Sequence, residues 1–373
     1  MNPDEILKTI LKKAEHNLNA NDVTDPSIRK DLEYVARVIS NRAGIRLLMS
    51  CLLAKIHKPK IDPRKPYTQI GSNDSFSGRT YDERYLTHFI TENNLPCNST
   101  TAFLTPALRN IDHPLTIDIE IVGRPRDVYS STLRLLDEVY KGSVTAEALL
   151  TDVIRLLIQW RNEKSHRMEQ HIRELQAGKG GLPLSSEQII TLIKQHLACK
   201  NSSRLAVLIV AAAYQAARLR IGEYGKSLLA HNAADFQTKA LGDVEVCLEG
   251  DDKVVTVYEM KMKRVTIDDI EVAAQKITRS NSGIQNYIFI TTEQIDPQVV
   301  DYAALFYEST NGIEIAILDC LGFLRHFLHF FHRLRSEFLD AYQNLVLNEH
   351  ESAVSQPLKE AFLALRKAAE SYE

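Results

Sequence analysis

The sequence has few of the features that mark secreted, disulfide-stabilised or membrane proteins. It contains only five cysteines in 373 residues, at Cys51, Cys97, Cys199, Cys247 and Cys320. Their odd number and wide spacing exclude a zinc-finger pattern and argue against a disulfide framework. No apolar run reaches the roughly 18 residues that span a bilayer, and residues 1–18 show an amphipathic helix pattern without a secretory apolar core. We therefore expect a cytoplasmic protein with reduced thiols and no membrane partner.

The sequence also lacks an excess of positive charge. Its formal net charge of −3 does not by itself indicate a nucleic-acid partner. Evidence for one must therefore come from local clusters of basic residues. Residues 55–67, KIHKPKIDPRKPY, place basic side chains among prolines that prevent regular structure. Lys58, Lys60 and Arg64 are candidates for contacts with phosphates. The alternative is a solvated basic loop, because charged runs are common on protein surfaces.

The remaining composition is that of a folded globular protein. Apolar residues make up 44% and charged residues 25% of the chain, which are ordinary values, and the length predicts two domains or one elaborated domain. Helical spacing of apolar residues covers 1–60 and 130–175, and the glycine-rich residues 176–183 are the clearest linker. We divide the chain into a mainly helical region at 1–180, a core at 181–350 and a C-terminal helix at 351–373.

After residue 230 the apolar periodicity changes from helical to alternating. It predicts strands at 243–249, 254–262, 286–292 and 313–319, with helices at 267–279 and 297–309 between the later strands. The first two strands are joined by a short turn and form a hairpin, whereas helical crossovers make the later strands parallel. The expected fold class is α/β, with a mixed sheet flanked by helices and a mainly helical N-terminal part.

The hairpin carries the residues with the clearest chemistry. Because side chains alternate along a strand, Glu259 and Lys261 share one face, and a three-residue turn would set Asp243 opposite Glu259 by pairing Glu249 with Lys253. Two carboxylates on adjacent strands suit Mg²⁺, which takes one or two of them and leaves sites for water and phosphate. Lys261 would hold or help deprotonate the attacking water and offset transition-state charge.

The alternative for this hairpin is a solvated sheet surface, which often carries alternating acids and lysines. Two further strands and the flanking helices should cover most of the sheet, however. Acids on a covered face need partners or a metal ion. A functional metal site is therefore the better explanation.

The same residues resemble a known nuclease motif. Gly242-Asp243, followed by Glu259-Met260-Lys261, is similar to the motif of PD-(D/E)xK nucleases, and the surrounding αβββαβ order is similar to that of the family. The proline of the motif is absent, with Gly242 in its place. The resemblance implies Asp243 and Glu259 as Mg²⁺ ligands and Lys261 as the catalytic lysine. The family's habit of an additional acid on the preceding helix adds Glu223.

A second resemblance lies in the N-terminal half. Residues 76–83 (FSGRTYDE) and 101–109 (TAFLTPALR) resemble the signature segment of SacI-type restriction endonucleases. This implies a type II enzyme that cuts double-stranded DNA at a short palindrome, leaves 5′-phosphate and 3′-hydroxyl ends, and has a cognate DNA methyltransferase as functional partner. A palindrome is most simply read by a homodimer. Arg79, Arg84 and Arg109 suit guanine readout or phosphate clamping, with surface ion pairs or loop anchors as the alternative.

Two other functions remain open at this point. One is a different PD-(D/E)xK nuclease, active in repair, in recombination or on modified DNA. The other is a helical DNA-binding protein without catalysis, whose hairpin charges are incidental. His326, His329 and His332 lie three residues apart and spread around a helix. They are expected to be polar edge positions rather than metal ligands.

Overall fold

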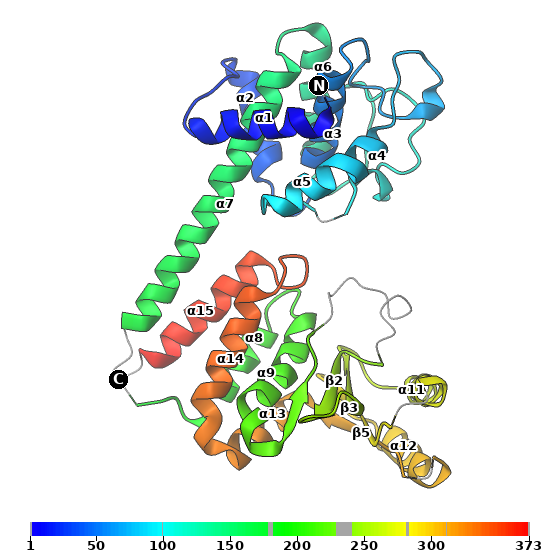
Figure 1. Ribbon diagram of the computed structural model, residues 1–373, viewed down its shortest axis with the longest axis vertical. Coiled ribbons are helices and arrows are strands. Elements are labelled where there is room, and N and C mark those ends of the chain that lie inside the picture. Colours follow the sequence, from blue (N-terminus) through cyan, green and yellow to red (C-terminus); the bar gives the residue numbers. More distant parts are fainter. Residues whose placement is uncertain are drawn as a thin grey trace. The chain divides into compact units, whose positions relative to one another are not determined.

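A computed structural model describes residues 2–98, 100–177, 182–228, 241–280, 283–310 and 312–371. The chain forms two compact units, Met1–Arg167 and Met168–Glu373. The boundary between them falls within the long helix α7 (Ala146–Ala177) (Figure 1). Four residues of the predicted linker, 178–181, lie outside the described residues.

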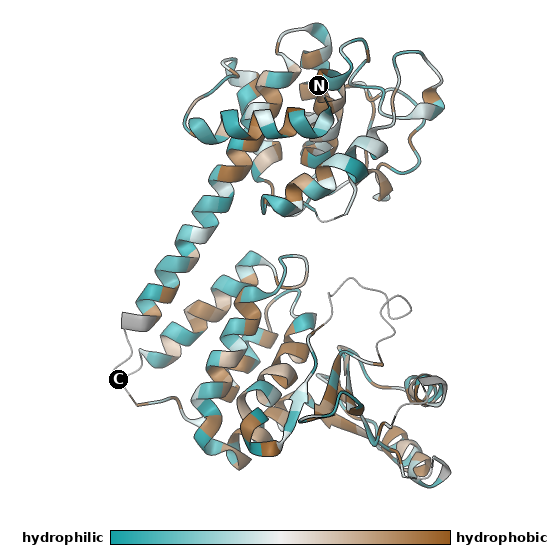
Figure 2. Ribbon diagram, in the orientation of Figure 1, coloured by the Kyte–Doolittle hydropathy of each residue, from teal (hydrophilic) through white to brown (hydrophobic). Residues whose placement is uncertain are grey.

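Unit 1 is helical, as its apolar spacing predicts. Its main helices are α1 (Pro3–His16), α2 (Pro26–Arg37), α3 (Ala43–His57), α6 (Asp127–Lys141) and the first part of α7. Helix α3 is buried along most of its length, and α1, α2 and α6 pack against it, so its apolar residues form the centre of this unit (Figure 2). Asn2 and Asp25 cap the backbone N–H groups that begin α1 and α2.

The polar segment after α3 is irregular and carries short helical turns. These are η1 (Thr68–Ile70), α4 (Gly78–Tyr81), η2 (Asp82–Leu86), α5 (Thr87–Glu92) and η3 (Ala102–Leu104). Helix α4 continues through the π-helical η2 into α5. A buried ion pair between Arg46 of α3 and Asp82 fixes this segment against the helical core.

Unit 2 combines a helical layer with the predicted sheet. The helices of this layer are α8 (Ser186–Leu197), α9 (Ser203–Ile221), α13 (Cys320–Phe330), the short η4 (His332–Leu334), α14 (Arg335–Asn348) and α15 (Gln356–Glu370). A capping box of Ser185 and Gln188 begins α8. Helix α9 packs against α14 and against the sheet, which explains why it is so apolar.

The sheet is mixed, which confirms the predicted fold class. Its strands are β1 (Glu223–Gly225), β2 (Val244–Leu248), β3 (Val254–Lys261), β4 (Asn286–Thr291) and β5 (Glu314–Asp319), in the order β1-β2-β3-β4-β5. The pairs β1/β2 and β2/β3 are antiparallel. The pairs β3/β4 and β4/β5 are parallel, and α11 (Ile267–Ser280) and α12 (Pro297–Ser309) are their crossovers.

The two faces of the sheet belong to different apolar clusters. Val244, Val246 and Tyr258 pack with α9 and α13 on one face. Cys247 and Val257 pack on the other, with residues of α11 and α12 (Figure 1). The sheet therefore lies between two helical layers, and the alternation of each strand decides which layer a side chain faces.

The register of the hairpin differs from the prediction near its turn. Val244 lies opposite Tyr258 and Val246 opposite Thr256, but Cys247 lies opposite Val254 because a β-bulge makes Val255 an extra residue. The predicted pairing of Glu249 with Lys253 is therefore wrong. Beyond the bulge, the Val244–Tyr258 pair still leads to Asp243 and Glu259 at the end of the ladder.

Among the described residues, no helix combines the length and apolar character that crossing a bilayer requires.

Candidate active site

Glu259 and Lys261 lie near the C-terminal end of β3, on the face that α11 covers. Alternation along the strand places both side chains on this face, and Glu259 is in register with Phe289 of the neighbouring strand β4. Their side chains are 17% and 20% exposed. Both charges are thus largely removed from water but can still be reached from outside.

Asp243 lies immediately before β2 and is fixed by the backbone of β3. Its own N–H donates to the carbonyl oxygen of Tyr258 over 2.8 Å. Its carboxylate oxygen Oδ2 accepts the N–H of Met260, also over 2.8 Å. The three residues predicted from the motif therefore lie at one end of the hairpin, with the Asp243 carboxylate beside the residue that follows Glu259.

Gly242, which replaces the proline of the motif, has a local structural reason. A Cβ atom at this position would lie 2.5 Å from Cγ1 of Val257 and 2.7 Å from the carbonyl oxygen of Tyr258. The chain crosses so close to β3 that no side chain fits without movement of the backbone. Glycine here permits the close approach that places Asp243.

The Glu259 carboxylate has a different set of partners on each of its oxygens. Oε1 lies 2.9 Å from the Lys261 ammonium group. Oε2 lies 3.1 Å from the Lys276 ammonium group of α11 and accepts the hydroxyl proton of Tyr287. Lys261 makes a second ion pair, 3.0 Å from Oδ1 of Asp269 in the first turn of α11.

Asp269, Lys276 and Tyr287 were missed by sequence reasoning. Asp269 and Lys276 are seven residues apart, which is about two helical turns, so they share one face of α11. An acid and a base at this spacing on a helix that follows the motif strand are a signal that the sequence offered. Tyr287 lies on the neighbouring strand, and its aromatic alternation gave no sign of a polar role.

The ion pairs shift the pKa values of this site in a consistent way. Burial alone would raise the pKa of Glu259, but the hydroxyl of Tyr287 and the ammonium groups of Lys261 and Lys276 lower it. Burial alone would lower the pKa of Lys261, but Glu259 and Asp269 raise it. Glu259 is therefore a carboxylate and Lys261 an ammonium ion at neutral pH.

The donor set fits a hard divalent cation in kind and number. Asp243 and Glu259 offer carboxylate oxygens, and Mg²⁺ usually takes one or two of these together with water and phosphate oxygens. No group of three or more His, Cys, Asp or Glu side chains converges as a metal site in the part of the chain that the structure describes. A cation here would thus depend on two acids, and it would replace ammonium groups on Glu259.

Glu223 does not lie where the motif places an extra acid. Helix α9 ends at Gly222, whose φ of 69° is left-handed, and Glu223 begins strand β1 opposite Leu248. Leu248 is five residues from Asp243 along β2, or roughly 16 Å at the usual rise per strand residue. Glu223 acts electrostatically on Tyr214 and Tyr258, on the face opposite Glu259. Its expected place on the preceding helix is a correction.

The basic loop of unit 1 divides into anchors and exposed residues. Arg64 pairs with Asp62 and Asp137, each over 3.0 Å, and its guanidinium lies 3.2 Å from the ring centre of Tyr140. These partners fix Arg64 within unit 1, and its contact with DNA stays a prediction. Lys58 and Lys60 are exposed and remain candidates for phosphate contacts.

The three arginines of the signature segment are exposed in unit 1. Arg79 of α4 pairs with Glu83 over 2.8 Å, and its side chain is 54% exposed. Arg84 lies near the ring of Tyr85, with 5.5 Å between guanidinium carbon and ring centre. Arg109 follows η3 and is also exposed. An exposed ion pair such as that of Arg79 exchanges readily with solvent, so all three remain candidates for DNA contacts.

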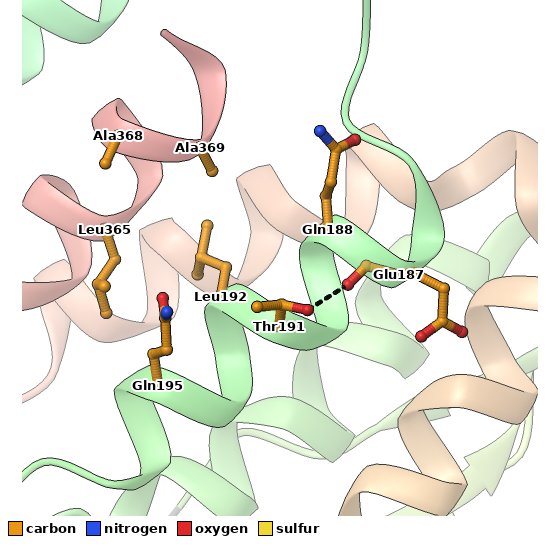
Figure 3. Close-up of a pocket in the computed structure, with 8 residues that line it drawn as sticks. All are labelled: Glu187, Gln188, Thr191, Leu192, Gln195, Leu365, Ala368 and Ala369. Carbon is orange, nitrogen blue, oxygen red and sulfur yellow. Dashed lines mark hydrogen bonds between the residues drawn. The ribbon is translucent and has the colours of Figure 1, made fainter. Parts of the chain in front are cut away.

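Two other places among the described residues of unit 2 have a different chemistry. His329 lies 3.1 Å from Glu187, which also pairs with Arg325, and His326 stacks on Phe330. A groove between α8 and α15 (Figure 3) has one acidic residue, Glu187, among the side chains that line it. Neither place brings two carboxylates together with a lysine.

Comparison with known families identifies the part of the chain that holds this site. Residues 183–293 match the family model described as the SacI restriction endonuclease C-terminal domain. This range begins just before α8 and ends just after β4, so it contains Asp243, Glu259 and Lys261. No curated protein matches the chain closely enough to count as a relative. The resemblance to SacI-type restriction endonucleases is thus confirmed over these residues, whereas that of residues 76–109 stays a prediction.

Proposed function

We propose that this chain, whose residues 183–293 match the SacI restriction endonuclease C-terminal domain, is a type II enzyme that hydrolyses double-stranded DNA at a short palindromic site with Mg²⁺. The supporting observation is the convergence of Asp243, Glu259 and Lys261 at one end of the β2–β3 hairpin, in the pattern of the PD-(D/E)xK nucleases. Asp243 and Glu259 are the proposed ligands of the cation.

The residues of the site would have separate roles in phosphodiester hydrolysis. When bound, Mg²⁺ supplies an activated water and neutralises charge on the phosphate. The N–H of Met260 holds the Asp243 carboxylate in place. Lys261, whose ammonium group lies 2.9 Å from Oε1 of Glu259, would hold or help deprotonate the attacking water and stabilise negative charge in the transition state.

DNA recognition is proposed for unit 1. Base readout needs donors that reach a groove, whereas phosphate hydrolysis needs only the metal site. Arg79, Arg84 and Arg109 are the proposed base or phosphate contacts, and Lys58 and Lys60 add positive charge. A homodimer on a palindrome would let each subunit cut one strand. A cognate DNA methyltransferase is the proposed functional partner.

Digestion of plasmids of known sequence tests this function. With Mg²⁺ the full chain should give discrete fragments, whose sequenced ends share one short palindrome and carry 5′-phosphate and 3′-hydroxyl groups. EDTA should abolish cleavage, and Asp243→Asn should remain inactive when Mg²⁺ is present. Fragmentation without a common sequence would favour another kind of nuclease. The absence of any cut would refute catalysis.

Sedimentation with the mapped duplex then tests the dimer. Two chains per duplex are expected, and one chain per duplex would refute the arrangement in which each subunit cuts one strand.

A further inference from the structure

Helix α11 presents two opposite charges to the strand motif. Asp269, in its first turn, faces the lysine of the motif, and Lys276, about two turns later, faces the glutamate. Glu259 and Lys261 thus pair with each other, and each has a second partner of opposite sign on the helix. Such a crossed arrangement of four side chains goes beyond the two carboxylates and one lysine that the motif requires.

The four side chains differ in how firmly they are held. Asp269 is fixed by the N–H and hydroxyl of Thr266, over 3.0 Å and 2.9 Å, and its other oxygen contacts Lys261. Lys276 reaches Glu259 through a long flexible side chain that is 25% exposed. The contact of Asp269 is therefore part of the helix start, whereas the Lys276 ammonium group can withdraw toward solvent at little steric cost.

Binding of a cation should affect the Glu259–Lys276 and Lys261–Asp269 contacts differently. A largely buried carboxylate needs a counter-charge at all times, and Lys276 provides one on Oε2 of Glu259 while no metal is bound. A divalent cation on Glu259 repels the ammonium group and supplies the counter-charge itself. Lys261 then loses part of its hold on Glu259 but keeps Asp269.

We propose that Lys276 is a resident counter-ion of Glu259 that the divalent cation displaces, and that Asp269 is a positioning residue that holds Lys261 during this exchange. The inference rests on the proposed function, since it takes Glu259 as a metal ligand. It makes α11 the element that sets both the affinity of the site for metal and the orientation of the lysine.

Titration with Mn²⁺ in the absence of DNA tests the first half. The free ion is followed by its electron paramagnetic resonance signal, with the full-length protein. Lys276→Gln removes the competing charge and should tighten Mn²⁺ binding about tenfold. Lys276→Arg keeps the charge and should bind Mn²⁺ within about threefold of wild type. Lys263→Gln, which removes a neighbouring exposed lysine, controls for the loss of one positive charge.

The outcomes of this titration are distinct. If wild type binds no Mn²⁺, or binds it equally well after Asp243→Asn, the proposed metal site is wrong. If binding depends on Asp243 but Lys276→Gln leaves it unchanged or weaker in a protein that melts at the wild-type temperature, the counter-ion role is wrong and the metal site stands.

Single-turnover cleavage tests the second half. Asp269→Asn keeps the size of the side chain but removes its charge, so Mn²⁺ affinity should stay within about twofold while the cleavage rate of bound DNA falls about a hundredfold. Asp269→Glu should recover part of the rate. Asp268→Asn, an exposed neighbour in the same helical turn, is the matched control. An unchanged rate in Asp269→Asn, or a loss that Asp268→Asn shares, would overturn the positioning role.

Discussion

Each unit contains a network of ion pairs. The network of unit 1 is closed, meaning that its charged groups are fully buried, whereas that of unit 2 is open, meaning that its charged groups are partly exposed. In unit 1, Arg46 and Asp82 are both fully buried. The guanidinium also donates to Thr87 and to the carbonyl of Asn98, and the second Asp82 oxygen accepts from Thr101 and from the N–H of Ala102. Every partner is a backbone group or a short side chain, so no member can move without leaving a buried charge unpaired.

In unit 2, the network around Glu259 remains partly open. The side chains of Glu259, Lys261 and Lys276 are between 17% and 25% exposed, and two of the three are long and flexible. Their contacts are ion pairs that can be exchanged for contacts with a ligand. The comparison shows that a charged cluster suits structure when its partners are fixed and suits binding when they are exchangeable.

The largest expected effect is the loss of cleavage when the open network loses its carboxylate. Glu259→Gln keeps the shape but removes the charge that would bind metal, so the cleavage rate should fall at least about a thousandfold. The melting temperature should change little, because Lys261 keeps its contact with Asp269 and Lys276 can reach solvent. Glu249→Gln, in which an exposed acid of the same hairpin loses its ion pair with Arg218, is the control. Cleavage by Glu259→Gln at near the wild-type rate would refute the site.

Disruption of the closed network in unit 1 should reduce stability. Arg46→Met leaves Asp82 as an uncompensated buried charge and should lower the free energy of unfolding of unit 1 by about 3–5 kcal/mol. The double variant Arg46→Met/Asp82→Leu should recover part of this loss, since neither charge remains. Urea denaturation followed by circular dichroism measures both. If the double variant is less stable than the single one, the unpaired Asp82 charge is not the cause of the loss in Arg46→Met.

The buried neutral histidine His196 should make the stability of the protein depend on pH. Burial between the Tyr342 hydroxyl and the Leu358 carbonyl lowers the pKa of His196 to about 4. The unfolded chain takes up a proton near pH 6.5 and the folded chain does not. Stability is therefore complete above pH 6.5 and should fall by up to about 3 kcal/mol as the pH drops to 4.

Denaturation midpoints between pH 7 and pH 4 measure this loss. His196→Gln should make the profile flatter, whereas His166→Gln, an exposed histidine, should leave it as in wild type. Equal slopes in all three proteins would mean that His196 does not carry the acid sensitivity.

The smallest expected effects separate exposed from anchored arginines. If Arg79, Arg84 or Arg109 reads a guanine, its change to Ala should cost about 1–3 kcal/mol of discrimination at one base pair without destabilising the fold. Arg64→Ala should instead lower stability, because it breaks the pairs with Asp62 and Asp137. Affinities for cognate and scrambled duplexes at several salt concentrations distinguish base from phosphate contacts. Full affinity and specificity in all three exposed variants would place recognition elsewhere.

What the sequence predicted well was local. The strands, the crossover helices and the face shared by Glu259 and Lys261 follow from alternation within a few residues. The errors arose from features that depend on distant or irregular contacts. Helix α9 ends at the left-handed Gly222, so Glu223 begins strand β1 instead of lying on the helix. The ion pair of Arg64 with Asp137, which local patterns do not reveal, joins residues 73 positions apart.

The partners of Glu259 were missed because they also lie far from it in the sequence. Lys276 and Tyr287 are 17 and 28 residues further along the chain. Only the helix-to-strand packing of the folded core brings them to the carboxylate. The spacing of Asp269 and Lys276 indicates a shared helix face but not which strand that face meets.

The β-bulge at Val255 has a consequence for how this hairpin tolerates changes in length. It lies between the turn and the paired segment that begins with Val244 and Tyr258, so a difference in the number of turn residues can be accommodated before it reaches that segment. The connection at 249–253 is therefore the place where we expect homologous chains to gain or lose residues, and where a peptide tag can be inserted while the spacing between Asp243 and Glu259 is retained.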